Sequence, residues 1–316
     1  MLKLPYGRRD FYEVITQNYL YIDRTHAIAD MEEWGKELLF LRPRRFGKSL
    51  WLSTLMNYYD VAKADDFERL FGHLAIGQEP TPLHNQYLVM RWDFSEISSH
   101  SSIEQIESVL NDYLNEWIAI FANKYKDLLR TEIRVNAENA LLTFKSAVAA
   151  VNSTPYKFYL FIDEYDNFAN EVMMSVRDHN VSNRPMPSHE RYQSLVTGEG
   201  MFKTFFKNIK SMGSGDGIDR VFVTGVSPVV MNDITSGANV FEDIYWFQQF
   251  NGLCGFWKSE VTDLLEQVIA ERGFPLTERA GKQAEALDMM RTFYDGSWFT
   301  TEVLPPDKAL SAQSRL

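Results

Sequence analysis

Leu38-Leu39-Phe40-Leu41-Arg42-Pro43-Arg44-Arg45-Phe46-Gly47-Lys48-Ser49 is the stretch of this chain that decides its fold. Its first four residues are apolar, as in a buried strand, and its last three close a loop with Gly-Lys-Ser. The run from Leu50 to Tyr59 then spaces its apolar residues as an amphipathic helix does. Strand, loop and helix in this order suit nucleotide phosphates, because backbone N–H groups and the helix N-terminus face the anion, a Lys neutralises it and a Ser hydroxyl reaches Mg²⁺.

The loop departs from the strict phosphate-loop pattern, G-x-x-x-x-G-K-[ST]. Arg42 stands at the first Gly position, and only Gly47, Lys48 and Ser49 fit. The tripeptide alone would equally suit a Gly that caps a turn, so the flanking strand and helix favour the phosphate-loop interpretation. We expect Lys48 to bind the β- and γ-phosphates and to count as catalytic, and Ser49 to bind Mg²⁺. The candidate nucleotide-binding residues are Arg44, Arg45, Phe46, Gly47, Lys48, Ser49 and Leu50.

A second strand ends in two carboxylates. The run from Tyr156 to Ile162 is aromatic and aliphatic, as in a central parallel strand, and Asp163 and Glu164 follow it. Asp163 at the end of such a strand is the candidate to hold Mg²⁺, and Glu164 is the candidate to polarise the water that attacks the γ-phosphate. The alternative is an ordinary strand end before a helix whose first turn is acidic.

A third strand is predicted from Arg220 to Val226, and it supplies a weaker signal. Some ATPases have an extra strand between the phosphate-loop strand and the acidic strand, and that extra strand ends in a polar residue that senses the γ-phosphate. Thr224 is our candidate for this catalytic role, and Ser227 is the second choice. The alternative is a Thr that satisfies a local backbone group. Asp93, which ends a predicted strand from Tyr87, could support Mg²⁺ or water indirectly.

Several motifs along the chain together resemble one known family. The chain is similar to the AAA-ATPase-like family of bacterial proteins, whose longer members often carry a PD-(D/E)XK nuclease-type domain after the ATPase. The most specific match is R-P-R-R-F-G-K-S, and it implies that Arg42 is the family's usual residue in place of Gly. The matching pieces, between about Leu4 and Phe299, are residues 4–7 with Phe11, 21–25 (Y-I-D-R-T), 42–49, 161–166 (F-I-D-E-Y-D), 223–228 (V-T-G-V-S-P), 254–256 and 294–296.

The order of elements predicts an α/β protein. We expect a P-loop NTPase three-layer α/β/α sandwich with a mainly parallel sheet and a C-terminal helical appendage. Ligands of such sheets lie at the carboxyl ends of the strands, where Lys48, Asp163 and Thr224 should converge. Predicted helices cover 8–20, 25–34, 50–59, 103–129, 136–151, 193–210, 258–269 and 283–291, and predicted strands cover 37–42, 87–94, 157–163 and 220–226. The predicted domains are an N-terminal segment 1–36, a core 37–244, an appendage 245–300 and a polar tail 301–316.

Composition narrows the classes of function. The chain has 316 residues, 45% of them hydrophobic, and a net charge of −11, which argues against a broad nucleic-acid-binding surface. The basic cluster of Arg42, Arg44, Arg45 and Lys48 is better explained by phosphate binding. The one cysteine, Cys254, is expected to be a small core residue rather than a nucleophile, and the absence of disulfide pairs fits the cytoplasm. No signal peptide and no membrane-spanning run is recognisable.

Three further expectations concern regions without a strong motif. The polar segment 177–191 is predicted to be a mobile loop, either a lid or partner contact near the nucleotide or an insertion without a role. An arginine finger cannot be assigned among Arg177, Arg184 and Arg220. The residues after Tyr294-Asp295-Gly296 leave no room for the nuclease-type domain of longer relatives, so we expect no nuclease activity of this chain.

The first functional hypothesis is an ATP-binding, Mg²⁺-dependent ATPase or ATP-driven switch that acts on a protein partner, a nuclease-type effector or a second copy of the chain. ATP is favoured over GTP by the resemblance and because no N-K-x-D motif reads guanine. The alternative is a nucleotide-sensing module that binds without turnover. A third hypothesis, a DNA-associated defence protein, is suggested only by the nuclease domain of longer relatives.

Overall fold

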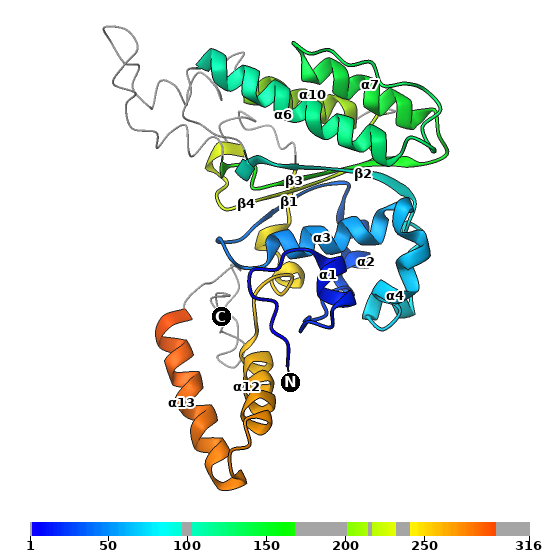
Figure 1. Ribbon diagram of the computed structural model, residues 1–316. Coiled ribbons are helices and arrows are strands. Elements are labelled where there is room, and N and C mark those ends of the chain that lie inside the picture. The colour runs from blue at the N-terminus through cyan, green and yellow to red at the C-terminus, as the bar shows by residue number, and fades with distance from the viewer. Residues whose placement is uncertain (1, 97–102, 168–200, 214–216, 232–240, 295–316) are drawn as a thin grey trace, which may run out of the picture.

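The computed structural model describes residues 2–96, 103–167, 201–213, 217–231 and 241–294 (Figure 1). Within these residues five strands form one sheet in the order β2-β3-β4-β1-β5, and every neighbouring pair is parallel. The strand bounds are β1 Glu37–Leu41, β2 Tyr87–Asp93, β3 Lys157–Asp163, β4 Arg220–Gly225 and β5 Glu242–Asp243. This order confirms the predicted extra strand, because β4 lies between the phosphate-loop strand β1 and the acidic strand β3.

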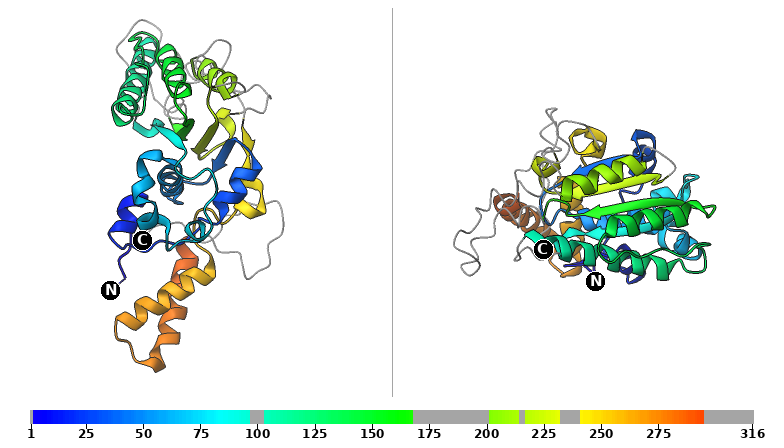
Figure 2. Two further views of the ribbon diagram at one scale, coloured as in Figure 1. Left: turned by 90° about the vertical axis from the view of Figure 1, so that its right-hand side faces the viewer. Right: turned by 90° about the horizontal axis from the view of Figure 1, so that it is seen from above.

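Helices cover both faces of the sheet, which confirms the predicted three-layer α/β/α class (Figures 1 and 2). One face carries α6, α7 and α10, and the other carries α1, α2 and α3, with the short α4 and α5 beyond them. The bounds are α1 Phe11–Thr16, α2 Ala27–Trp34, α3 Lys48–Tyr59, α4 Phe67–Phe71, α5 Ala75–Gln78, α6 Ile103–Lys124, α7 Ala140–Asn152 and α10 Met201–Gly213.

The apolar strands are buried on both faces because each face meets a different helix layer. On one face Trp92 of β2 packs against Phe144 of α7 and Phe205 of α10, with ring centroids 4.7 and 5.2 Å apart. On the other face Tyr159 of β3 packs against Tyr59 of α3 at 5.0 Å. The continuous hydrophobic strands of the sequence therefore correspond to a sheet enclosed by two helix layers.

The C-terminal described residues form a helical hairpin that projects from the core (Figure 1). After the short turns η3 (Ile244–Trp246) and η4 (Gln248–Phe250), the chain forms α12 (Lys258–Glu271) and α13 (Leu276–Tyr294). The two helices lie side by side and away from the sheet (Figure 2). The predicted helical appendage is thus present, and its exact domain boundaries, like those of the N-terminal segment and the tail, stay predictions.

Some element boundaries differ from the predicted ones. The long helix α6 ends at Lys124 rather than residue 129, and the chain continues in turns in which the Leu128 N–H bonds three residues back to the Tyr125 carbonyl. The helix α13 begins at Leu276, before the predicted start at residue 283. The short edge strand β5 was not predicted, because two polar residues are too few to show the alternation of apolar and polar residues that indicates a strand. The predictions for residues 177–191 and 301–316, for the start of the helix at 193 and for the end of the chain after Tyr294 lie outside the described residues.

Candidate functional site

The phosphate loop connects β1 to α3 at the carboxyl edge of the sheet. Two of its residues adopt the left-handed region, Arg45 with φ 70° and Gly47 with φ 97°. A Cβ built at Gly47 would meet no atom within 4 Å, so the backbone here borders open space. Loops in which the backbone changes hand in this way form concavities lined by N–H groups that bind anions. The helix α3 begins at Lys48, directly after this concavity.

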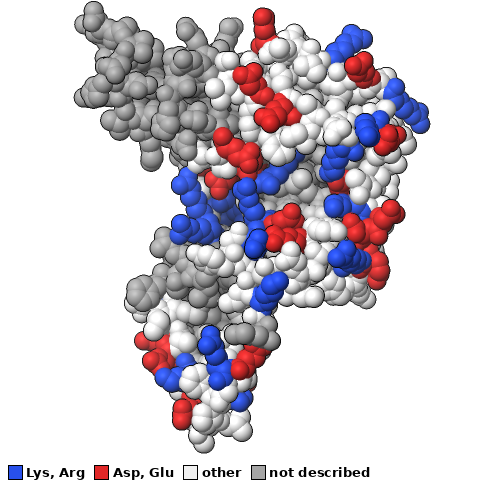
Figure 3. Space-filling view, in the orientation of Figure 1, with Lys and Arg blue, Asp and Glu red and all other residues white. Residues whose placement is uncertain are grey.

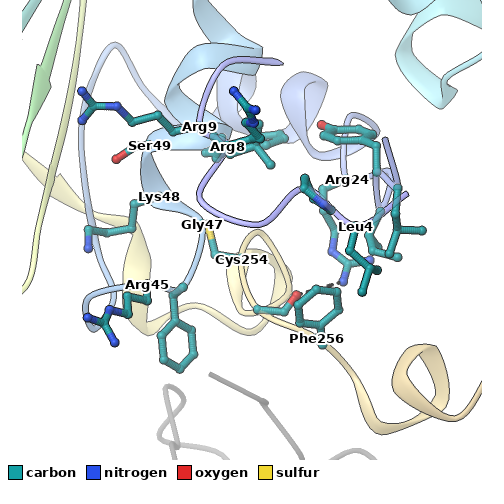
Figure 4. A pocket seen from close by; sticks show the side chains of 18 of the residues that line it. Leu4, Arg8, Arg9, Arg24, Arg45, Gly47, Lys48, Ser49, Cys254 and Phe256 are labelled. Carbon is teal, nitrogen blue, oxygen red and sulfur yellow. Dashed lines mark hydrogen bonds between the residues drawn. The ribbon is translucent and has the colours of Figure 1, made fainter. Parts of the chain in front are cut away.

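Lys48 is folded into its own loop. The side chain is buried, and its Nζ donates a hydrogen bond of 3.3 Å to the Pro43 carbonyl. Lys48, Ser49 and Arg45 line the same pocket and lie near one another in Figure 4. A phosphate in the concavity would take the place of the Pro43 carbonyl as the partner of the ammonium group.

Arg42 has a structural role that the sequence interpretation did not foresee. Its side chain is 1% exposed, and its guanidinium donates to the carbonyls of Leu41 (2.8 Å) and Tyr245 (3.1 Å). Weaker bonds reach the carbonyls of Phe250 and Asn251, and the guanidinium lies 4.6 Å from the centroid of the Phe40 ring. The expectation that Arg42 joins the phosphate-binding cluster is therefore wrong, because this arginine fastens the start of the loop to the η3–η4 segment.

Asp163 and Thr224 meet at the ends of two neighbouring strands. The Thr224 hydroxyl donates a 2.6 Å hydrogen bond to Asp163 Oδ1, and both residues are fully buried. The contact exists because β3 and β4 are parallel neighbours and end at the same edge. The structure thus brings together the candidate Mg²⁺ carboxylate and the candidate γ-phosphate sensor, while their roles stay predictions.

Glu164 follows Asp163 in a constrained backbone conformation. Its φ is 49°, an unusual value for a residue with a side chain, and such strain gathers at functional sites. Burial raises the pKa of Glu164, whereas the nearby charges of Lys48 and Arg44 act to lower it. Glu164 also lines the pocket together with Lys48 and Ser49, while its role as a base stays a prediction.

An alternating row of charges runs from the pocket to Asp163. Arg9 Nη1 lies 3.2 Å from Asp93 Oδ2, Arg91 Nη2 lies 2.8 Å from the same oxygen, and Arg91 Nη2 also lies 2.9 Å from Asp163 Oδ2. Asp93 and Asp163 are register partners on β2 and β3, which places the two carboxylates side by side. Asp93 also accepts bonds from the Ser95 N–H and hydroxyl. The predicted support role of Asp93 is consistent with this position.

A pocket of about 820 Å³ opens beside the phosphate loop (Figure 4). Its described lining carries the cations Arg8, Arg9, Arg24, Arg45 and Lys48, against the carboxylate of Glu164. Figure 3 shows a group of Lys and Arg side chains between the sheet core and the helical hairpin. The lining is also apolar in part, with Leu4, Leu20, Ile22, Leu253, Phe256, Leu264, Leu265 and Met290.

The hairpin is fastened to the far side of this pocket by an ion pair. Arg24 and Glu260 of α12 form two hydrogen bonds, of which the one from Nη2 measures 2.7 Å, and both side chains are largely buried. Gly255 donates its N–H to the Phe46 carbonyl at 3.0 Å. The segment before α12 is therefore bonded to the phosphate loop, and the start of α12 to the N-terminal segment.

Other candidates have local partners. Ser227, the second choice as sensor, donates its N–H to Asp166 and accepts from the Val229 N–H. Arg220 starts β4 at the opposite edge of the sheet, where it donates to the Glu32 and Gly35 carbonyls, so it does not lie at this site. Arg177 and Arg184 lie outside the described residues.

Cys254 is partly buried, and its side chain packs against the hydrophobic core while it also lines the pocket. Burial raises the pKa of Cys254 to about 12, so the thiol is protonated at neutral pH. A protonated thiol is a poor nucleophile, which agrees with the expected lack of a catalytic role.

The phosphate-binding candidates separate into two groups. Arg45, Phe46, Gly47, Lys48, Ser49 and Leu50 line the pocket. Arg44 does not line it, and its Nη2 donates to Asn167 Oδ1 at 2.5 Å, after the acidic strand. Arg44 thus connects the phosphate loop to the segment that follows Glu164 in the chain.

Reasoning from the phosphate loop missed Arg9, Arg24 and Arg91. The sequence did hold a signal for the regions of Arg9 and Arg24. Family motifs cover residues 4–7, just before Arg9, and residues 21–25, which include Arg24, and both motifs contribute residues to the lining of the pocket. No motif marks Arg91. A charged residue within an otherwise apolar strand does not show which carboxylate of a neighbouring strand it will contact.

The fold and site together define a class of protein. A parallel sheet of this strand order, a Gly-Lys-Ser loop between β1 and α3, and an Asp-Glu pair at the end of β3 are the features of a P-loop protein of the AAA-ATPase type. The family model described as "Predicted AAA-ATPase" matches residues 5–235, and the chain belongs to this family. Family membership therefore supports nucleotide binding and an ATPase assignment at the level of the family.

The chain is also similar to a curated bacterial protein over nearly its whole length. The chain is 25% identical over 322 residues to the "Uncharacterized protein in vnfD 5'region" of Azotobacter chroococcum mcd 1. The match covers 99% of this chain and 52% of the relative, so the chain spans about half the length of that protein. No solved structure matches the chain. Among the described residues, no helix combines the length and apolar character that a bilayer crossing needs.

Proposed function

We propose that this protein binds ATP with Mg²⁺ and hydrolyses it, as an ATPase or ATP-driven switch that acts on a partner or an effector domain. The observation that carries the proposal is the two-sided pocket of about 820 Å³. Its cationic side, formed by the phosphate loop with Arg8 and Arg9, suits a triphosphate, and its apolar side suits a nucleobase.

The chemistry of two oxygen donors supports Mg²⁺ as the cation. Ser49 carries a hydroxyl at the start of α3, and Asp163 carries a carboxylate at the end of β3, and hard oxygen ligands of this kind suit the ion. When bound, Mg²⁺ supplies neutralisation of phosphate charge. Lys48 would bind the phosphates, Glu164 would take a proton from the attacking water, and Thr224 would hold Asp163 in place.

The experiment that tests nucleotide binding is a titration with a fluorescent ATP analogue, with the corresponding GTP analogue alongside. The proposal expects saturable binding to the wild type, at least about tenfold weaker binding to Lys48→Ala and unchanged binding to Arg130→Ala, whose side chain is exposed. Equal binding to wild type and Lys48→Ala would refute a phosphate site at this loop. A preference for the GTP analogue would refute the choice of ATP alone.

A second candidate function, nucleotide sensing without turnover, is favoured by the closed arrangement of the site. Lys48 bonds to Pro43, and both oxygens of Asp163 already have partners. In a sensor, Glu164→Gln would leave nucleotide binding and the response to nucleotide unchanged. In an ATPase, the same variant would retain ATP that the wild type converts to ADP.

A further inference from the structure

Arg91 of β2 holds an unusual position between two buried carboxylates. A single nitrogen, Nη2, lies 2.8 Å from Asp93 Oδ2 and 2.9 Å from Asp163 Oδ2. The Arg91 side chain is 19% exposed, whereas those of Asp93 and Asp163 are 2% and 1% exposed. One positive group thus bridges two oxygens in a nearly water-free place, as a small cation would.

The guanidinium of Arg91 does not form all the hydrogen bonds that it could form. An arginine that pairs with one carboxylate usually does so through two parallel N–H bonds, but here one nitrogen serves both partners. Arg91 Nε is buried and has no hydrogen-bond partner among the described residues. A buried donor without a partner costs free energy, so this position of the guanidinium is not its best-bonded one.

The two carboxylates explain why a cation is needed. Asp93 and Asp163 are register partners on adjacent strands, and like charges at this distance repel strongly when they are buried. Arg9 neutralises part of the charge from the pocket side of Asp93, but its side chain is 57% exposed and its bond is longer, at 3.2 Å. Arg91 is therefore the main counter-charge of Asp163 in the described structure.

We propose that Arg91 occupies the cation position of Asp163 and competes with a divalent cation for this carboxylate. The inference rests on the proposed function in that it concerns the same Asp163. Arg91 withdraws from Asp163 when a divalent cation arrives with the nucleotide, and it retains Asp93 as its partner. Asp163 keeps its hydrogen bond from Thr224 throughout, so its position is preserved while its counter-charge changes. Arg91 is thus a positioning residue that sets how much divalent cation the site requires.

The test is Mn²⁺ binding to the nucleotide-free protein, followed by electron paramagnetic resonance. Because the competing charge is removed, Arg91→Gln should bind Mn²⁺ about tenfold more tightly than the wild type. Arg91→Gln/Asp163→Asn should lose this gain, and Arg130→Gln, at an exposed arginine, should match the wild type. Equal Mn²⁺ affinity of the wild type and a folded Arg91→Gln overturns the proposal and leaves Arg91 a purely structural ion pair.

A second variant guards against misfolding of the first. Arg91→Gln/Asp93→Asn avoids two uncompensated carboxylates, and its matched reference is Asp93→Asn, which lacks the same carboxylate but keeps Arg91. The double variant must bind Mn²⁺ more tightly than Asp93→Asn, and equal affinity of these two variants overturns the proposal too. The measurement contains no nucleotide, so it separates the two claims. Tighter Mn²⁺ binding by Arg91→Gln, without any ATP binding by the wild type, would support the role of Arg91 and refute the proposed function. Unchanged Mn²⁺ affinity, with ATP binding by the wild type, would refute the role of Arg91 and support the proposed function.

Discussion

The hydroxyl of Thr224 lies 2.6 Å from Asp163 Oδ1, a contact between the ends of two neighbouring parallel strands. It joins Thr224, which the sequence predicts as a γ-phosphate sensor, to the carboxylate proposed to hold Mg²⁺. Because both residues are fully buried, the hydroxyl cannot be replaced by water without a change in packing. The contact therefore offers a way to disturb the site without touching the phosphate loop.

Replacement of this hydroxyl should separate binding from turnover. Thr224→Val leaves one oxygen of Asp163 with one partner fewer, so we expect a loss of about 1–3 kcal/mol in unfolding free energy. ATP hydrolysis should fall about tenfold or more while ATP binding changes little, because Lys48 is untouched. Urea denaturation and steady-state phosphate release measure the two effects. Thr224→Ser keeps the hydroxyl and should stay close to the wild type; equal loss in both variants would show that the methyl group, not the bond, matters.

Arg42 should matter for stability rather than for nucleotide affinity. The side chain is 1% exposed and donates to the carbonyls of Leu41 and Tyr245, so Arg42→Met would leave these buried groups without their donor. We expect a cost of about 2–4 kcal/mol in unfolding free energy, measured in urea. Arg130→Met, at an exposed position, should change it by less than about 0.5 kcal/mol. A stable Arg42→Met with weakened ATP binding would instead return Arg42 to the phosphate site.

If Glu164 is the general base, the rate of ATP hydrolysis should depend on pH. Burial raises its pKa above the ordinary value of 4.5, so the carboxylate becomes protonated at a higher pH than a free one does. Since a general base acts only when deprotonated, the rate of ATP hydrolysis should fall as the pH drops through this raised pKa. The acid limb of the rate profile should therefore lie above pH 4.5. A wild-type rate that is flat through this range, with a limb only at or below the ordinary value, would argue against Glu164 as the base.

The same shift predicts the sign of a stability difference. A carboxyl whose pKa is raised on folding contributes stability below its unfolded value of about 4.5, and this contribution is lost as the pH rises through the folded-state pKa. The melting temperature of Glu164→Gln, relative to that of the wild type, should therefore increase as the pH rises through this window. Glu138→Gln, at an exposed position, should show no such trend. A difference that is constant with pH would contradict the raised pKa.

The ion pair of Arg24 with Glu260 should couple the N-terminal segment to the helical hairpin. Their side chains are only 13% and 19% exposed and share two hydrogen bonds, so a double-mutant cycle with Arg24→Ala and Glu260→Ala should give a coupling of about 1–3 kcal/mol. Hydrogen exchange should also become faster at the start of α12 in either variant. Lys282→Ala with Glu285→Ala is the matched control, because that pair on α13 is exposed. A coupling near zero would show that the hairpin is held by its apolar contacts alone.

The sequence predicted the fold well where one signal was strong. The strands β1, β3 and β4 and the placement of β4 in the sheet followed from continuous apolar runs and from the polar residue Thr224 at the end of its strand. Lys48 followed from the loop between a buried strand and a helix, and Asp163 and Glu164 followed from their position at the end of a buried strand. These features are local in sequence, so a single chain is enough to recognise them.

Long-range contacts between polar groups could not be predicted in the same way. The role of Arg42 depends on the carbonyls of Tyr245 and Asn251, and that of Arg91 depends on the register between β2 and β3. The partner of Arg24 lies on a helix more than two hundred residues away. Residue type and spacing say which groups are charged, but only the packed structure says which charges meet.

The measurement that tests the central claim most directly is phosphate release from Mg²⁺-ATP by the wild type, Lys48→Ala and Glu164→Gln, with nucleotide binding recorded on the same samples. The proposed function predicts hydrolysis by the wild type, loss of ATP binding in Lys48→Ala, and ATP retained without phosphate release in Glu164→Gln. If the wild type releases no phosphate and Glu164→Gln behaves as the wild type does, the protein is not an ATPase by itself. If no sample binds ATP, the phosphate loop of this chain is not a nucleotide site.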